Sequence, residues 1–206
     1  MDMDAFTLKQ WPLLMASSNG TALPVLADGV RYIAASSGLW RETKLPWLHA
    51  VLPVAVNAAA RVPYGNLQPT VRFLCSFPPQ RLWRDFTAYA KAQMPNECGA
   101  AMLWNPETDT WRLAIRRAIQ ASGDRLDYEE VDLEGPEILV VDVHSHGVFP
   151  SMFSDVDDVD DAGSMKLAAV IGQLDATMDM AVRLSVVDTF LQVNIKSDAS
   201  WEAVLC

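Results

Sequence analysis

The sequence predicts an α+β fold, because one amphipathic helical segment is followed by segments that resemble strands up to the end of the chain. The helical segment covers residues 80–94, where four apolar residues recur at helical spacing until Pro95 ends the pattern: Leu82, Phe86, Tyr89 and Ala90. The strand-like segments that follow are 98–105, 111–119, 126–133, 137–145, 166–174, 180–188 and 190–195. The last three are expected to close the fold as a meander.

The first part of the chain differs from the rest because proline is dense in it. Helices longer than two turns hardly fit between these prolines, so short strands and turns are expected. The best strand candidates are 29–36 and 70–77, which alternate between apolar and polar residues. The one segment with room for a helix is 48–60, which Pro53 would kink.

This change in texture near residue 80 predicts two parts. Residues 1–79 form an N-terminal extension of short strands and turns, whose role the sequence does not reveal. Residues 80–206 form the second domain, which carries the regular helix and strand pattern. The short strands and tryptophans of the extension indicate that it packs on the second domain and is not a disordered tail.

Composition and charge exclude several classes of protein. The chain has 206 residues, of which 50% are hydrophobic and 20% charged, and its net charge of −10 repels phosphate backbones, so nucleic acid is not an expected partner. No apolar run is long enough to span a membrane, and the acidic start is unlike a signal peptide. The three unevenly spaced cysteines form neither a disulfide framework nor a zinc site. We therefore expect a soluble cytoplasmic protein that binds no membrane.

Segment 137–145 is an almost continuous apolar run, as expected for a central strand buried on both faces, and two of the three histidines of the chain, His144 and His146, lie at its end. Residues i and i+2 of a strand point to the same face, about 6.5–7 Å apart. Both imidazoles can therefore converge on one ion where the strand ends. A catalytic zinc ion takes three protein ligands and leaves a position for water. Asp157 can return across a loop to supply the third ligand.

Three other interpretations of this segment compete with a metal site: ordinary histidines, a calcium-binding loop and a solvated acidic turn. An isolated His-x-His pair is more often two ordinary histidines, but the buried strand before it and the Ser-x-x-Asp after it favour a site. Calcium binding in an EF-hand is excluded, because Val159 and Asp160 stand where an oxygen ligand and a glycine are needed. For the acidic residues other than Asp157, a solvated turn that opens a helix is the preferred interpretation.

The spacing of the polar residues resembles a known motif. His144-x-His146, seven residues, Ser154, two residues and Asp157 reproduce the JAMM motif of the JAB/MPN zinc metallopeptidases without a gap. Glu97 follows the predicted helix and precedes a strand, which is where that family has a glutamate. Within the prokaryotic JAB type, the chain resembles the PRTRC system protein A group, which also has an N-terminal extension.

The resemblance implies a fold, a cofactor and a role for each residue. The fold would be the JAB/MPN, cytidine deaminase-like mixed sheet flanked by helices. One Zn²⁺ per chain would be bound by His144, His146 and Asp157. Glu97 would act as general base and then acid, and Ser154 would donate a hydrogen bond to the oxyanion.

The implied activity is hydrolysis of a peptide or isopeptide bond, with the C-terminus of a ubiquitin-like or sulfur-carrier-like protein as the expected substrate. Two alternatives remain open: a zinc hydrolase of a small-molecule amide, and a non-catalytic MPN-type interaction module. The chain departs from the family at Gly147, where many members have proline, which alters the loop without removing a catalytic atom.

Four further residues near or outside the motif are expected to have no direct role in the site. His49 is expected to be a packed or partly exposed histidine and not a ligand. Cys98 and Ser145 are expected to point away from the metal because strand residues alternate. Ser151 could replace Ser154, but its spacing to Asp157 favours Ser154.

Overall fold

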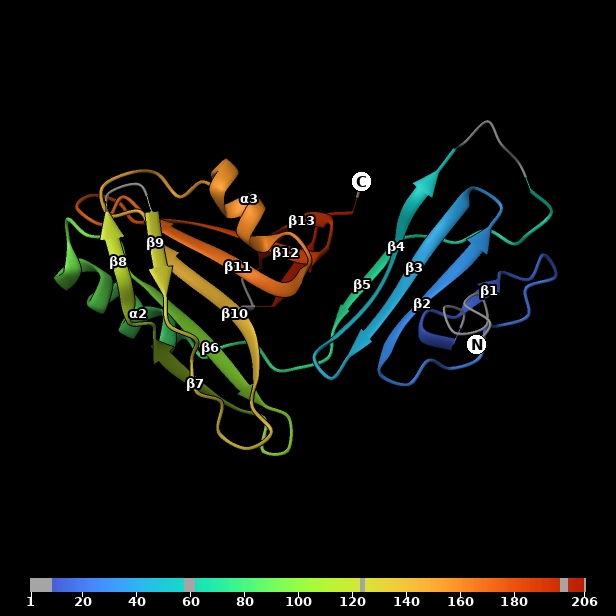
Figure 1. The fold of residues 1–206 in the computed structure, drawn as a ribbon, viewed down its shortest axis with the longest axis horizontal. Helices are drawn as coiled ribbons and strands as arrows, with labels where there is room; N and C mark the ends of the chain where they lie inside the picture. The colour runs from blue at the N-terminus through green and yellow to red at the C-terminus, as the bar shows by residue number, and fades with distance from the viewer. Residues whose placement is uncertain (1–8, 58–61, 123–124, 197–199, 206) are drawn as a thin grey trace. The chain divides into compact units, whose positions relative to one another are not determined.

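The computed structural model describes residues 9–57, 62–122, 125–196 and 200–205, with the side chains of 118–128 left out. The chain divides into two compact units, Met1–Cys75 and Ser76–Val204. Figure 1 shows the strands and helices of each unit. His144, His146 and Asp157 all lie in the second unit.

The first unit is built on one five-stranded sheet, in the order β1-β2-β3-β4-β5. Strands β1 and β2 are parallel and the other neighbours are antiparallel. The bounds are β1 Leu13–Met15, β2 Gly29–Ala35, β3 Gly38–Leu45, β4 Leu48–Val56 and β5 Thr70–Phe73. A core cluster on one face contains Ala16, Ile33, Ala35 and Trp40.

The one segment with room for a helix, 48–60, is strand β4, Leu48–Val56, in its described part, in agreement with the short strands expected for this part of the chain. Leu48, Ala50 and Leu52 are buried and alternate with half-buried residues, which is the period of a strand. Pro53 is tolerated because the register between β3 and β4 shifts beside it, so the missing N–H interrupts a ladder that is already irregular. The expected strand at 29–36 is confirmed as β2, and the strand expected at 70–77 is the shorter β5.

The second unit is built on a seven-stranded mixed sheet, in the order β14-β13-β12-β11-β10-β6-β7. Strands β10 and β11 are parallel, and every other neighbouring pair in this sheet is antiparallel. The expected meander is confirmed in β11, β12 and β13. The bounds are β6 Gly99–Asn105, β7 Thr110–Ile115, β10 Ile138–Ser145, β11 Ser164–Gly172, β12 Asp179–Val187, β13 Thr189–Ile195 and β14 Trp201–Ala203.

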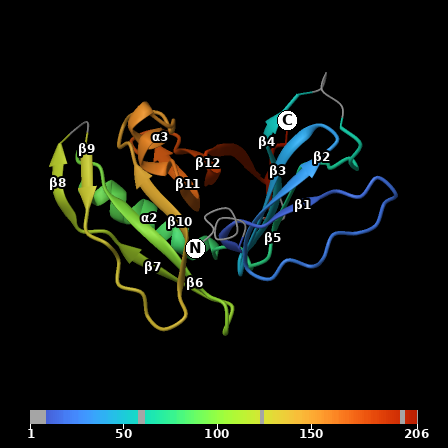
Figure 2. The same ribbon diagram turned by 45° about the vertical axis from the view of Figure 1, so that its right-hand side comes forward.

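Helix α2, Gln80–Gln93, confirms the helix expected from the periodicity, and its buried residues are Leu82, Phe86 and Ala90. The helix lies along β6 and β7, on the face of the sheet opposite to helix α3, Asp155–Asp161 (Figures 1 and 2). None of the described helices is long and apolar enough to cross a membrane.

The fold is richer in sheet than the expected α+β arrangement, with two helices among the described elements. The segment expected as one strand at 111–119 divides into β7 and β8, Ala118–Ser122. Strand β8 forms a separate two-stranded sheet with β9, Arg125–Tyr128. The acidic stretch that contains Asp157 forms helix α3, which lies in the connection between the parallel strands β10 and β11.

The C-terminal half of the central strand β10 is fully buried on one face only, which corrects the expectation of burial on both faces. Val140 and Val141 are both fully buried, but beyond them Val143 and Ser145 are buried whereas Asp142 and His144 on the other face are half-buried. The half-buried face is the one toward α3, because Asp142 and the α3 residue Asp161 both pair with Lys166. The polar residues of an otherwise apolar strand therefore lie on the face of the sheet that α3 covers.

Candidate metal centre

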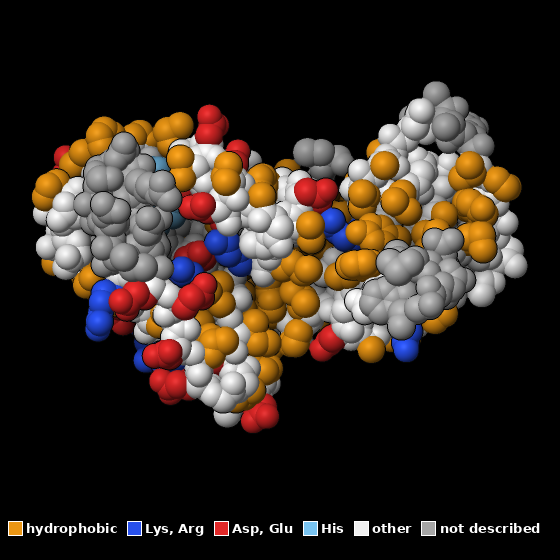
Figure 3. Space-filling view, in the orientation of Figure 1, with side chains coloured by type: hydrophobic (Ala, Val, Ile, Leu, Met, Phe, Trp, Pro, Cys, Tyr) orange, Lys and Arg blue, Asp and Glu red, His pale blue; other side chains and the backbone are white. Residues whose placement is uncertain are grey.

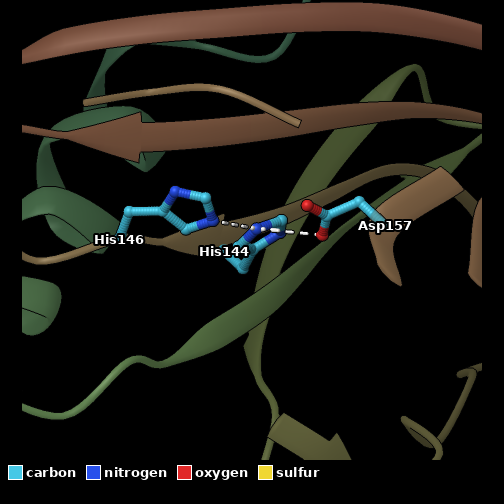
Figure 4. Close-up of side chains that lie close together, drawn as sticks. All are labelled: His144, His146 and Asp157. Atoms are coloured by element: carbon cyan, nitrogen blue, oxygen red, sulfur yellow. Dashed lines mark hydrogen bonds and ion pairs between the residues drawn. The ribbon is translucent and has the colours of Figure 1, made fainter. Parts of the chain in front are cut away.

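Three side chains converge where β10 ends. His144 lies on β10, His146 lies just beyond it, and Asp157 comes from α3 in the crossover to β11. One ligand atom of each residue lies within 4.8 Å of the other two (Figure 4). Among the described residues, this is the group of histidines, cysteines and acids with the spacing to hold a metal ion.

The two imidazoles turn their Nε2 atoms toward each other, and His144 Nε2 also faces Asp157. His144 Nε2 lies 3.1 Å from His146 Nε2 and 3.3 Å from Asp157 Oδ1. His146 Nδ1 lies 3.2 Å from the carbonyl oxygen of Pro150, which accepts a hydrogen bond from that nitrogen. With its proton on Nδ1, His146 presents the lone pair of Nε2 to the centre of the group.

Close packing of the loop that follows His146 fixes the position of this histidine. The His146 N–H donates to the carbonyl of Ile171 on β11, and the Gln173 N–H donates to the carbonyl of Phe149, both at 2.9 Å. Gly172 makes this approach possible, because a Cβ at that position would lie 2.4 Å from the carbonyl oxygen of Phe149. Any side chain at Gly172 would therefore push the histidine loop away from the end of β11.

Gly147 gives the departure from the family pattern a structural meaning. Its φ of 57° lies in the left-handed region, whereas proline is fixed near −65°. The Gly147 carbonyl also accepts a hydrogen bond from the Leu174 N–H at 2.9 Å. This loop therefore leaves the second histidine along a path that a proline-containing loop cannot follow.

Ser154 and Asp157 form a reciprocal cap at the start of α3. The N–H and the hydroxyl of Ser154 both donate to Asp157 Oδ2 at 2.7 Å, and the Asp157 N–H donates to Ser154 Oγ at 3.3 Å. One carboxylate oxygen is thus held by Ser154 while the other, Oδ1, faces His144. This capping role was not predicted from the sequence, although Ser-x-x-acid at the start of a helix is the signature of a capping box.

The electrostatics of the group favour metal ligation at neutral pH. Burial lowers the pKa of His144, and the neighbouring Asp157 only partly opposes this, so the imidazole is neutral and its lone pair is available. Burial alone would raise the pKa of Asp157, but the hydrogen bonds from Ser154 lower it below its ordinary value. The side chains of His144 and Asp157 remain 22% and 19% exposed, so the group is open to solvent on one side.

Glu97 lies just before β6, the strand that pairs with the histidine-bearing strand β10. Gly99 on β6 lies opposite His144, and the Ser145 N–H donates to the Cys98 carbonyl at 2.9 Å. Glu97 and His146 lie just beyond the paired residues of these strands. The converging group contains His144, His146 and Asp157 and does not include Glu97, so its place beside them stays a prediction.

Cys98 and Ser145 point to the opposite face, as expected from strand alternation. Both are buried, and the Ser145 hydroxyl accepts a hydrogen bond from the Cys98 N–H at 3.2 Å. Burial raises the pKa of the Cys98 thiol, which disfavours the thiolate that a nucleophile requires. Ser151 is anchored elsewhere, because its N–H donates to the carboxylate of Asp179 on β12.

Two expectations about other polar residues have different outcomes. His49 lies on β4 in the first unit, where its Nε2 is 2.9 Å from Glu42 Oε1, so it is a partly exposed, paired histidine as expected. The solvated acidic turn that opens a helix is wrong for one member of the acidic stretch, Asp161, which is 5% exposed and pairs with Arg183 of β12. Asp158 also pairs with Arg183, but its side chain stays 51% exposed. A buried carboxylate needs such a partner, which the local sequence does not reveal.

A strand-end pair of histidines and a helix-borne carboxylate on a mixed sheet form a group that could hold a metal ion. Residues 79–185 match the family described as prokaryotic homologs of the JAB domain, which is more than half of the chain. The chain therefore belongs to the prokaryotic JAB family. Residues 1–74 match a domain of unknown function, DUF2016. No curated protein matches the chain.

Proposed function

We propose that the protein is a zinc-dependent hydrolase of peptide or isopeptide bonds. The observation that carries this proposal is the convergence of ligand atoms from His144, His146 and Asp157 within 4.8 Å of one another. Membership of the JAB family supports it, because that family includes peptidases. Residues 80–206 would form the hydrolase domain, and residues 1–79 an added unit whose role stays open.

The donor set fits zinc better than a hard cation. Two imidazole nitrogens and one carboxylate oxygen are the ligands of a catalytic zinc site, whereas calcium and magnesium prefer oxygen ligands alone. The neutral state of His144 and the ionised state of Asp157 are the forms that bind a metal. When bound, zinc supplies a Lewis acid and lowers the pKa of a coordinated water toward about 7.

Two other residues of the motif would act on the substrate. Glu97 would take the proton of the attacking water and deliver it to the leaving amine. The Ser154 hydroxyl would turn from Asp157 Oδ2, which it contacts in this structure, to donate to the oxyanion. Because all five residues of the motif are present, a non-catalytic interaction module is less consistent with this chain than an enzyme.

The substrate is proposed from the family resemblance and from the open side of the group. The partial exposure of His144 and Asp157 leaves room for an extended chain to approach. We propose the C-terminus of a ubiquitin-like or sulfur-carrier-like protein as that chain.

Removal and return of the metal test the proposed function. Purified protein is incubated with a library of fluorogenic peptides that carry an amide-linked leaving group. We expect hydrolysis to stop after treatment with a chelator and to return when zinc is added back. Hydrolysis that persists at undetectable zinc would contradict the proposal, as would the lack of any hydrolysis by the zinc-loaded protein.

Replacing Ser154 by alanine is expected to have two effects, because its hydroxyl has two partners in this account. Zinc affinity falls by about 10- to 100-fold, since a hydrogen bond that orients a ligand is lost. At saturating zinc, kcat falls by about 100- to 1,000-fold through loss of the oxyanion donor. The matched control is Ser151→Ala in the same loop, which leaves both unchanged. Full activity of Ser154→Ala would move the oxyanion role elsewhere.

A further inference from the structure

Five charged side chains join helix α3 to the face of the sheet that carries His144. We call them the α3 anchor: Asp142 of β10, Lys166 of β11, Arg183 of β12, and Asp158 and Asp161 of α3. In Figure 3, acidic and basic side chains lie next to one another below the position of α3. The anchor thus connects three neighbouring strands to one short helix.

Arg183 is the centre of the anchor and is 7% exposed. Its Nε and Nη2 donate to Asp161 Oδ2 at 3.0 and 2.7 Å, and its Nη1 donates to Asp158 Oδ1. The guanidinium also lies over the rings of Phe153 and Phe190, 4.0 and 4.3 Å from their centroids. One cation therefore holds both the segment that leads into α3 and the last turn of the helix.

Lys166 supplies the second cation of the anchor. Its Nζ lies 2.8 Å from Asp161 Oδ1 and 2.8 Å from Asp142 Oδ2, so each oxygen of Asp161 has a cationic partner. Burial alone would lower the pKa of Lys166, but the two carboxylates raise it, so this lysine is charged at neutral pH. Because a buried carboxylate without a partner is costly, these contacts determine where Asp161 can lie.

Apolar packing does not hold α3 in place. The helix has seven residues, which is far shorter than a helix that is stable by itself. Its two valines, Val156 and Val159, are 53% and 75% exposed and so contribute little burial. The less exposed side chains of α3 are Asp157 and Asp161, which are four residues apart and share a face of the helix. Ionic contacts at Asp161 therefore replace the apolar face that usually docks a helix.

We propose that Arg183 is a positioning residue that keeps α3 on the sheet so that Asp157 meets His144. This inference rests on the proposed metal site, because the position of Asp157 matters most if Asp157 is a ligand. A planar guanidinium can hold two carboxylates and stack on two rings at once. Lysine is a point charge and cannot reproduce this set of contacts, so Arg183→Lys is not a conservative change.

The test compares Arg183→Met with Arg112→Met in the full-length protein. Arg112 is the control, because it lies on β7 of the same sheet and outside the anchor. Its guanidinium also donates two hydrogen bonds to one carboxylate, that of Glu137, at 2.9 and 2.5 Å. Zinc affinity is measured by competition with a chromophoric chelator. Hydrogen exchange of the α3 amides in the metal-free protein gives a second readout, and thermal unfolding reports overall stability.

We expect Arg183→Met to weaken zinc binding by about 10- to 100-fold, as for other residues that orient a ligand, and to speed exchange of the α3 amides. Arg112→Met lowers the unfolding temperature but leaves zinc affinity and α3 exchange unchanged. If Arg183→Met does not fold, Arg183→Lys carries the same expectation with a smaller effect.

The failure of each idea has its own result. If the wild type binds no zinc, the proposed function fails, and α3 exchange still tests Arg183 in the metal-free protein. If the wild type binds zinc and the Arg183 variants match it in affinity and in α3 exchange, the positioning role is overturned. Equal losses in the Arg183 and Arg112 variants would also overturn it, because they would show general destabilisation.

Discussion

Glu97→Gln is expected to abolish turnover while leaving zinc bound. The amide keeps the size and shape of the side chain but cannot accept a proton from the attacking water. Loss of a general base lowers kcat by about 100- to 10,000-fold. The zinc content stays at the wild-type value, because the three converging ligand atoms come from other residues. Steady-state hydrolysis and elemental analysis of the same preparation measure the two effects together.

The matched control for this prediction is Glu107→Gln, which makes the same chemical change at an exposed position between β6 and β7. This control is expected to retain full activity. Loss of zinc in Glu97→Gln would make Glu97 a ligand instead of a base. Undiminished turnover would remove it from the mechanism.

Asp157→Ala is expected to weaken zinc binding by more than the 10- to 100-fold typical of residues that only orient a ligand. The variant removes both Oδ1, which faces His144, and Oδ2, which accepts two hydrogen bonds from Ser154. Competition with a chromophoric chelator measures the affinity. Asp160→Ala, an exposed acid on the same helix, is the control and is expected to bind zinc as the wild type does.

Loss of the helix cap could weaken zinc binding without any direct role of Asp157 as a ligand. Asp157→Asn separates the two effects, because its amide oxygen can still accept hydrogen bonds from Ser154 while the negative charge is lost. We expect the asparagine variant to retain the fold and still bind zinc far more weakly than the wild type. Wild-type affinity in Asp157→Asn and Asp157→Ala would exclude Asp157 from the coordination shell.

The parts of the structure that depend on local sequence were predictable. Helix α2 follows from apolar residues at helical spacing and a proline that ends them, and β10 follows from an apolar run. The grouping of His144, His146 and Asp157 was also predictable, because the two histidines are two residues apart at a strand end and the aspartate follows in the next connection. Local periodicity and short sequence separation carried these predictions.

Features that depend on long-range pairing were not predicted. Arg183 reaches Asp158 and Asp161 only because β12 pairs with β11 in a register that no local pattern specifies. One signal was present, since a lone arginine in the apolar strand that became β12 requires a charged partner. The strand at Leu48–Val56 was obscured by Pro53, whose effect depends on the irregular register of β3 beside it.

The metal content of the purified protein, measured by elemental mass spectrometry beside His146→Ala, tests the central claim most directly. The geometry of the histidines and Asp157 predicts about one zinc ion per chain in the wild type, as in other three-ligand catalytic sites, and its loss in the variant. Absence of metal from the wild type, even after zinc is supplied and unbound ions are removed, would contradict the account. The JAB domain of this chain would then retain the motif without its chemistry.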